Sequence, residues 1–317
     1  MRRLHAASMV GAVLVLLWAS ACRSDASRDA IAGASSTPNV SGTPGSPVAT
    51  PSETPPKEIT AEDFQANNFD DPITIDNEWF PLPPGTQYVY RGQTIEDGER
   101  TPHRVISTVT DLTKMINGVR TVVIWERDYS AGELEESELA FFAQDSDGNV
   151  WHLGQYPEEY EEGKLVEAPA WIAGLKGARP GIAMKAAPRL GTPSYSQGYA
   201  PPPINWVDHA RVYKTGQKTC VPFGCFEDIL VTEEFEPTKP GAYQLKYYAQ
   251  GVGNIRVGWR GKDDQKETLV LVRVIQLSAE ALEEVRAEAL ALEERAYRVS
   301  KDVYRLTPPA EHAREAE

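Results

Sequence analysis

Cys220 and Cys225 lie close enough in the chain to form a disulfide. They flank Val-Pro-Phe-Gly, a tight turn between two segments with the pattern of strands. Cβ atoms directly opposite each other on such strands lie about 4.5–5.5 Å apart, near the separation that a disulfide needs. A redox-active pair usually has Cys-x-x-Cys spacing beside a helix N-terminus, and no second cysteine pair completes a zinc site. The sequence therefore predicts a structural disulfide between Cys220 and Cys225.

Asp145, Asp147 and Asn149 carry the next candidate chemistry. Their spacing matches the first half of a calcium-binding loop, but the position that should supply a bidentate Glu is Tyr156. Asp, Asn and Gly also favour tight turns, so a hairpin turn explains the same residues. We expect a turn and keep a calcium site as the alternative.

No motif for nucleophilic catalysis is present in the sequence. Gly-x-Ser-x-Gly, Ser-x-x-Lys and His-Glu-x-x-His are all missing. His103, His152 and His209 are scattered over predicted strands and loops, and we expect surface or satisfied core residues. The acidic runs 133–138 and 158–162 could supply the carboxylate pair of a glycoside hydrolase, but a solvated strand edge also explains them. We predict no catalytic residue, no cofactor and no metal site, with a carboxylate-pair hydrolase as an alternative.

Residues 1–21 have the pattern of a signal peptide. Two arginines precede an apolar run at residues 10–18, which is too short to span a bilayer. The small residues Ala19-Ser20-Ala21 then precede Cys22. This stretch resembles a bacterial lipobox, in which the cysteine is lipidated and becomes the new N-terminus. Lipidation would also remove the odd thiol of an exported protein. The alternative is ordinary cleavage after Ala-Ser-Ala, which leaves Cys22 as a free thiol.

Composition defines the segment that follows and limits the partners. Residues 22–57 are rich in Ser, Thr, Pro, Gly and Ala. They cannot bury enough apolar surface to offset their ordering entropy, so we expect a disordered tether. The net charge of the chain is −14. This charge argues against a nucleic-acid partner and against electrostatic docking to anionic lipid.

Residues 58–277 have the pattern of one antiparallel β domain. From residue 86 onward, β-branched and aromatic residues recur with period two and are separated by turn signals, of which Asn117-Gly118 is the strongest. Strands of this length must twist and curl, so we expect a curved meander sheet; the alternative is a two-sheet sandwich. The stretch 168–208 is rich in Gly, Pro and aromatics, and it is either a lid over a cavity or a cross-connection that seals one end.

The C-terminal segment 278–306 has the pattern of a long amphipathic helix, followed by a tail at residues 307–317. Ser278 is a plausible N-cap. Apolar residues follow at spacings of three and four, from Leu282 to Leu306. A coiled-coil dimer would use this stripe for weak self-association. A helix that lies on its own sheet has the same stripe, and we favour this interpretation.

Three stretches carry a resemblance to a known group: Trp-Phe-Pro-Leu-Pro-Pro-Gly-Thr-Gln-Tyr-Val-Tyr at residues 79–90, Phe-Ala-Gln-Asp-Ser-Asp-Gly-Asn-Val-Trp at 142–151 and Tyr-Tyr-Ala-Gln-Gly-Val-Gly at 247–253. They resemble uncharacterised bacterial exported β proteins related to the TapB/DUF3108 group, and the chain departs from that pattern at Cys225. The resemblance implies a curved antiparallel half-barrel similar to that of LolA-like lipoprotein carriers. It brings no catalytic residues.

These features together predict a bacterial lipoprotein that is anchored outside the cytoplasm by a lipid on Cys22. A curved sheet can enclose an apolar cavity, so we expect a binding module for a lipid or another hydrophobic ligand, without enzymatic activity. The rings expected to line that cavity are Trp125, Phe141, Trp151 and Trp171. The alternatives are a cell-envelope scaffold that pairs through the C-terminal helix, and the carboxylate-pair hydrolase.

Overall fold

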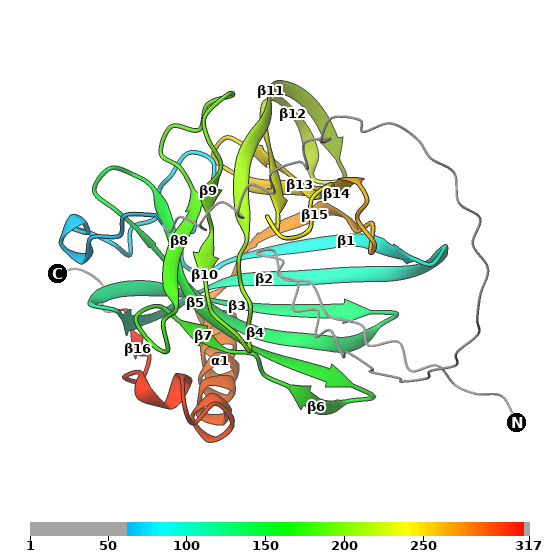
Figure 1. Cartoon of the computed structure of the whole chain (residues 1–317). Coiled ribbons are helices and arrows are strands. Elements are labelled where there is room, and N and C mark those ends of the chain that lie inside the picture. Colours follow the sequence, from blue (N-terminus) through cyan, green and yellow to red (C-terminus); the bar gives the residue numbers. More distant parts are fainter. Residues whose placement is uncertain (1–61, 314–317) are drawn as a thin grey trace, which may run out of the picture. The chain divides into compact units, whose positions relative to one another are not determined.

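The structure, a computed structural model, describes residues 62–313 of the 317-residue chain. The predicted signal peptide (residues 1–21), the predicted lipidation site Cys22 and the predicted tether (22–57) lie outside the described residues. Figure 1 shows that strands make up most of the described part. One long helix, α1 (Ala279–Val299), follows the last long strand.

The strands follow one another as hairpins, interrupted by one irregular stretch. In chain order they are β1 (Thr86–Glu96), β2 (Glu99–Ile116), β3 (Val119–Ser130), β4 (Glu133–Gln144), β5 (Val150–Glu161), β6 (Lys164–Glu167), β7 (Trp171–Ile172), β8 (Arg179–Met184), β9 (Tyr195–Ser196), β10 (Gly198–Tyr199), β11 (His209–Val221), β12 (Gly224–Phe235), β13 (Ala242–Ala249), β14 (Gly253–Gly261), β15 (Thr268–Gln276) and β16 (Glu311–His312). Two short 3-10 helices are η1 (Ala66–Asn68) and η2 (Tyr304–Leu306).

Within the described residues these strands form one open, curved antiparallel sheet that does not close into a barrel. The strand order is β10-β8-β5-β4-β3-β2-β1-β15-β14-β13-β12-β11-β9. Off this path, β6 and β7 pair with β5, and β16 pairs with β2. The predicted fold, a curved meander sheet with one long C-terminal helix, is confirmed, and the two-sheet sandwich is wrong. Long antiparallel strands twist, which accounts for the curvature.

The turn between β2 and β3 sets the register of the hairpin end next to it, and a register shift between Val109 and Thr113 follows further along β2. Asn117 and Gly118 have φ values of 48° and 83°, the left-handed values that a type I′ turn needs at both positions. Ile116 and Val119 then pair directly. The prediction of a hairpin at Asn117-Gly118 is therefore confirmed.

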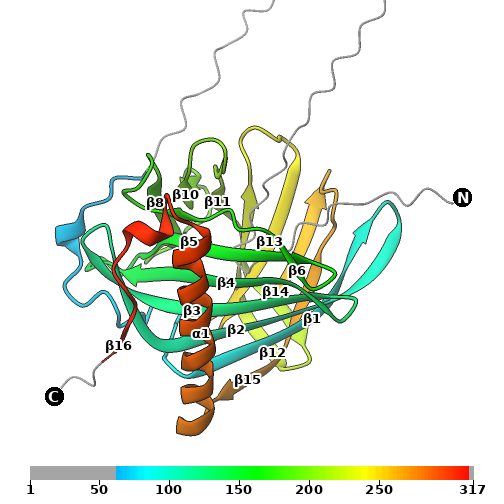
Figure 2. The ribbon, with the colours of Figure 1, turned by 90° about the horizontal axis from the view of Figure 1, so that it is seen from below.

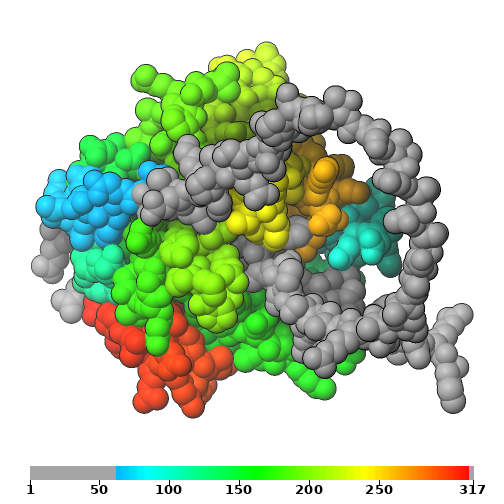
Figure 3. Space-filling view, viewed as in Figure 1, coloured from blue at the N-terminus to red at the C-terminus, as the bar shows by residue number. Residues whose placement is uncertain are grey.

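The irregular stretch 168–208 connects the two ends of the sheet. Its strand β8 pairs with β5, and its strand β9 pairs with β11. Of the two predicted roles, the pairing supports the cross-connection. Figure 3 shows residues of this stretch, in green, at the surface of the molecule.

Curvature brings side chains from distant strands together on one face of the sheet. A hydrophobic cluster on that face includes both Ile124 of β3 and Leu230 of β12, although β2, β1, β15, β14 and β13 lie between these two strands in the sheet order. We call the side that these residues share the concave face. A second cluster covers the opposite, outer face of β2–β5 and includes the buried side of α1.

Helix α1 packs on the outer face with its apolar stripe toward the sheet. Ser278 caps it by accepting a hydrogen bond from the Ala281 backbone N–H at 3.3 Å. The buried apolar residues are Val285, Ala289, Leu292 and Ala296. The helix contacts β2 and β4, and Figure 2 shows it crossing these strands. The prediction that the helix lies on its own sheet is confirmed.

The helix ends at Val299, seven residues before the predicted end at Leu306. Ser300 leaves the helical conformation, and its hydroxyl accepts a hydrogen bond from the Tyr304 backbone N–H at 3.2 Å. The chain turns because Tyr304 is fully buried against Phe141 and other rings of the outer cluster. A stripe at helical spacing gave no indication of this turn.

A buried ion pair fixes the helix on the sheet. The Lys114 ammonium of β2 donates to the Glu293 carboxylate of α1 at 2.6 Å, to the Tyr297 hydroxyl at 3.0 Å and to the Pro308 carbonyl at 2.5 Å. Burial lowers the pKa of Lys114, and the nearby Glu293 offsets part of this shift. Both charges are buried away from water. Removal of either residue would therefore leave the other charge without a counter-charge.

We predict that Lys114→Met lowers the free energy of unfolding by about 3–5 kcal/mol, since it leaves Glu293 buried without a counter-charge. The double variant Lys114→Met/Glu293→Leu should recover most of the loss, because it removes both buried charges. Urea denaturation at pH 7 measures both effects. The exposed Lys301 supplies the control variant Lys301→Met. A Lys114→Met variant as stable as the wild type would contradict the role of this pair.

Candidate functional site

A row of carboxyl groups crosses the middle of the concave face. Glu126 of β3 is directly opposite Glu138 of β4. Asp128 of β3 is opposite Glu136 of β4, which in turn is opposite Glu159 of β5. Cβ atoms of such pairs lie about 4.5–5.5 Å apart. We call these five residues the carboxylate row.

The position of β4 corrects the prediction for the acidic run 133–138. A solvated strand edge was expected there, but β4 lies between β3 and β5 within the sheet. Glu136 is 4% exposed and Glu138 is 0% exposed. They share a face with Ala140 and Phe142 of the concave cluster, because side chains two apart point the same way in a strand.

His103 balances part of the charge at one end of the row. Its Nε2 atom contacts the Asp128 carboxylate, and its Nδ1 atom lies 3.0 Å from the Glu267 carboxylate. Burial alone would lower the pKa of His103, but Asp128 and Glu267 outweigh it and raise the pKa to about 11. His103 is therefore a buried core residue between two carboxylates and not a surface residue, but its Nδ1 atom has no hydrogen-bond partner.

Polar contacts continue from His103 toward β12 and β13. Gln244 of β13 donates a hydrogen bond to Glu267 at 3.0 Å. The neighbouring Lys246, which is 1% exposed, forms an ion pair with Glu234 of β12 at 2.8 Å. Glu234 and Gln244 are also walls of a groove, so the polar network connects the carboxylate row to that groove.

The groove has a volume of about 340 Å³. Ligand pockets usually measure about 300–1,000 Å³, so this groove is large enough for a small organic molecule. Its walls carry charges of both signs together with two aromatic rings. They are formed by Asp208, Glu234, Phe235, Glu236, Lys239, Pro240, Ala242, Tyr243, Gln244, Lys262, Asp263 and Asp264. Burial, with repulsion from Glu236 and Glu234, raises the pKa of Asp208 well above its usual range.

A second, much smaller cavity of about 50 Å³ lies at the other end of the carboxylate row. It is mostly apolar, with Glu126 as its charged residue. Its lining is Phe80, Pro81, Leu82, Tyr88, Tyr90, Ser107, Ile124, Glu126, Ala140, Phe142, Val252, Gly253 and Asn254. A sugar or peptide substrate needs far more room. The converging carboxylates therefore do not by themselves support the hydrolase alternative.

Glu138 has no compensating partner. Neither of its carboxyl oxygens has a hydrogen-bond partner, although the side chain is fully buried. Burial, followed by repulsion from Glu126 and Glu159, raises the pKa of Glu138 well above the usual range of a glutamate. Buried polar groups are normally paired, so an unpaired carboxyl group marks a candidate functional position.

We predict that Glu138→Gln stabilises the protein, and does so more at high pH. The raised pKa means that the folded state of the wild type holds this proton after the unfolded state has released it near pH 4.3. The wild type therefore loses stability as the pH rises above that value, by up to about 1.4 kcal/mol per pH unit. Urea denaturation from pH 5 to pH 8 should show an increasing advantage of Glu138→Gln.

The control is Glu133→Gln, at an exposed position of the same strand, for which we expect no such trend. Equal pH dependence of Glu138→Gln and the wild type would refute a raised pKa at Glu138.

The four rings predicted to line a cavity do not surround a common space. Trp125, Phe141 and Trp151 belong to the outer cluster, and Trp171 belongs to the concave cluster. All four are at most 8% exposed, and none of them lines either cavity described above. These rings form core packing, which aromatic content alone cannot distinguish from a ligand site.

The candidate calcium residues form a turn. The Asp145 carboxylate accepts hydrogen bonds from the Asn149 backbone N–H and from the Trp151 indole N–H, both at 2.7 Å. Asp147 accepts one from Asn68 at 3.0 Å. Turn formation thus accounts for all three residues. In residues 62–313, no group of three or more His, Cys, Asp or Glu side chains is arranged to hold a metal ion.

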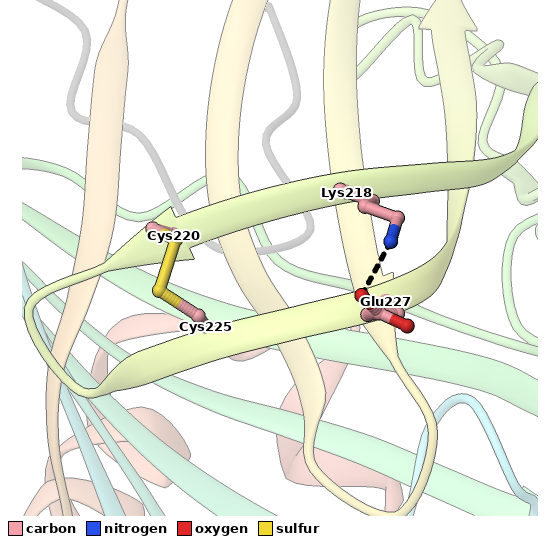
Figure 4. Close-up of a disulfide and its surroundings, with 4 residues drawn as sticks. All are labelled: Lys218, Cys220, Cys225 and Glu227. Carbon is pink, nitrogen blue, oxygen red and sulfur yellow. Dashed lines mark hydrogen bonds and ion pairs between the residues drawn. A yellow bond between two sulfur atoms is a disulfide. The ribbon is translucent and has the colours of Figure 1, made fainter.

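Cys220 and Cys225 are directly paired in the register of β11 and β12 and form a disulfide. Figure 4 shows that the disulfide closes the end of this hairpin, with an ion pair between Lys218 and Glu227 further along the two strands. The disulfide stands apart from the residues that line the groove. Its place agrees with the structural role predicted from the spacing.

Comparison with known proteins shows no family for this chain. No family model and no curated protein matches the chain, so the resemblance to the TapB/DUF3108 group gains no support from them. One similar solved structure is a candidate exported protein with a YmcC-like fold from Bacteroides fragilis, which is 17% identical with a TM-score of 0.38. Another is a candidate lipoprotein from Parabacteroides distasonis, which is 14% identical with a TM-score of 0.30.

Each match covers 63% of this chain and 99% or 100% of the other. At these TM-scores, neither likeness carries an argument about function. No helix in residues 62–313 is long and apolar enough to cross a membrane.

Proposed function

We propose that this protein is an extracytoplasmic lipoprotein, anchored through Cys22, whose folded part binds a polar organic ligand in the groove. The observation that carries the proposal is the groove itself, whose volume of about 340 Å³ is the size of a ligand pocket. Two of its wall residues, Glu234 and Gln244, belong to the buried polar network. The N-terminal segment supplies the anchor in this proposal, and the sheet supplies the site.

The lining of the groove favours a polar ligand over a lipid. Lys239 and Lys262 face it together with Asp208, Glu236 and Asp263. A hydrocarbon chain would desolvate these groups without pairing them, and that cost opposes binding. Tyr243 and Phe235 add ring surface against which the body of a small organic molecule can pack.

The scaffold alternative has less support. It needs an apolar helix face for a partner, and that face of α1 is already buried on the outer cluster through Val285, Ala289 and Leu292.

Cysteine pairing supports the anchor. Cys220 and Cys225 are joined to each other, so the chain has one further cysteine, Cys22. This residue directly follows the small residues of the signal-peptide cleavage region. Lipidation would use the remaining thiol. With at least two acyl chains attached, it would retain the protein at the membrane surface.

We predict that the wild-type protein fractionates with membranes and that Cys22→Ala is released as soluble protein, because it lacks the lipid-bearing thiol. Cell fractionation and the mass of the N-terminal peptide measure the two consequences. The control is the double variant Cys220→Ser/Cys225→Ser, which should stay with membranes. A soluble wild type with no lipid mass on Cys22 would show plain secretion instead.

For the groove, we predict a co-purified small molecule that native mass spectrometry detects on the protein isolated from its own host. Ala242→Phe should abolish this adduct, since the larger side chain fills part of the groove wall. Ala187→Phe, at an exposed position outside the lining, is the matched control. An adduct that persists in Ala242→Phe would place the ligand elsewhere, and an adduct of lipid mass would contradict a polar ligand.

A further inference from the structure

The groove of about 340 Å³ contains a buried carboxyl group that no other side chain binds. Asp208, the residue before β11, lines this groove and is 7% exposed. Its backbone carbonyl accepts a hydrogen bond from the Gln197 backbone N–H at 2.8 Å, which holds the backbone in place. Within residues 62–313, the Asp208 carboxyl group itself has no hydrogen bond and no ion pair.

The two lysines near Asp208 are each paired with another carboxylate. Lys246 pairs with Glu234 at 2.8 Å, and Lys239 pairs with Glu236 at 2.8 Å. These lysines offset only part of the shift that burial, Glu236 and Glu234 impose, so the pKa of Asp208 lies well above its usual range. A buried carboxyl group without a partner, in the wall of a groove, marks a position for a donor from outside the chain.

Gln244 of β13 supplies a second unsatisfied acceptor in the same wall. Its Nε2 atom donates to the Glu267 carboxylate at 3.0 Å, which fixes the orientation of the amide. Its buried Oε1 atom has no hydrogen-bond partner. The groove therefore presents two acceptors, from β13 and from the residue before β11, that lack donors.

The charge of the lining indicates the sign of the ligand. Five lining residues are acidic and two are basic. An anion would meet this excess of carboxyl groups, and a neutral polyol would leave it uncompensated. A guanidinium group carries five N–H donors in one plane and no acceptor, which suits a wall of unsatisfied acceptors. It also stacks on aromatic rings, and the rings of Phe235 and Tyr243 line the groove.

We propose that the groove binds a guanidinium compound, with the Asp208 carboxylate as its ionic partner and the Gln244 side-chain oxygen as a second acceptor. The planar cation donates N–H groups to these oxygens, and the rest of the ligand lies along the groove. This inference rests on the proposed function, since it names the ligand class of the same groove. Two sources present this group, a free guanidino compound and an arginine side chain of a peptide.

Binding should release a proton and should tighten as the pH rises. The raised pKa means that Asp208 holds its proton to a higher pH than an ordinary aspartate, whereas a guanidinium stays charged. The carboxylate forms as the cation binds, and the carboxyl proton leaves to solvent. The other charged groups that act on Asp208 are Glu234, Glu236, Lys239 and Lys246.

The test is isothermal titration of the full mature protein at pH 8 with butylguanidinium chloride and with butylurea, its uncharged analogue of similar shape. We expect saturable binding of butylguanidinium only, with proton release shown by titrations in two buffers of different ionisation enthalpy. Asp208→Asn should weaken binding at least about tenfold, because charge-assisted hydrogen bonds are lost. Asp302→Asn, at an exposed position outside the lining, should bind as the wild type does.

A second probe separates the two sources. N-acetyl-arginine amide carries the guanidinium group on a peptide unit. Tighter binding of this compound than of butylguanidinium would indicate an arginine side chain of a peptide, and weaker binding would indicate a free guanidino compound.

Ala242→Phe should abolish binding of butylguanidinium while Asp208 remains, and circular dichroism checks that each variant is folded. The inference is overturned if the wild type shows no saturable binding of butylguanidinium, if butylurea binds equally well, or if folded Asp208→Asn retains the wild-type affinity. In each of these cases the groove proposal itself stands if Ala242→Phe still removes the co-purified adduct, so the two failures are distinguishable.

Discussion

The structure depends on one constraint: the central strands of an open, curved sheet are buried on both faces. Helix α1 covers the outer face, and the curvature of the sheet covers the concave face with its own distant strands. A charged side chain at a buried position of these strands therefore loses water on folding and must find a partner or shift its pKa. Two buried ion pairs meet this requirement. Lys114 pairs with Glu293 on the outer face, and His103 pairs with Asp128 on the concave face.

The same constraint explains which parts of the fold could be predicted from the sequence. Strand and turn positions follow local rules, since period two and residues such as Asn117 and Gly118 act over a few residues. The disulfide follows from the same kind of local geometry. The early end of α1 does not, because it depends on the burial of Tyr304 against rings from other strands. No spacing rule within the helix contains that information.

The candidate site was harder to predict than the fold. A charged residue in a strand is usually assigned to solvent, and that rule fails where neither face is solvated. A usable signal existed in β4, where Glu136 and Glu138 continue the same alternation as Ala140 and Phe142. Acidic side chains in phase with core residues indicate a buried polar row. Trp125 and Trp151 were predicted to line a cavity, but they pack in the outer cluster. Large rings occur both in ligand cavities and in ordinary cores, and the sequence does not distinguish the two.

A neighbouring carboxylate shows that the unpaired state of Glu138 is not a general property of this sheet. Glu158 of β5 is also fully buried, but it accepts hydrogen bonds from Tyr156 at 2.8 Å, from Tyr160 at 2.5 Å and from Arg295 at 3.0 Å. The sequence thus provides a complete set of donors for one buried carboxylate and none for another on an adjacent strand. Unsatisfied buried groups are costly, and native structures retain them chiefly where they serve a function. The contrast between Glu158 and Glu138 therefore assigns the first to structure and marks the second as a candidate functional position.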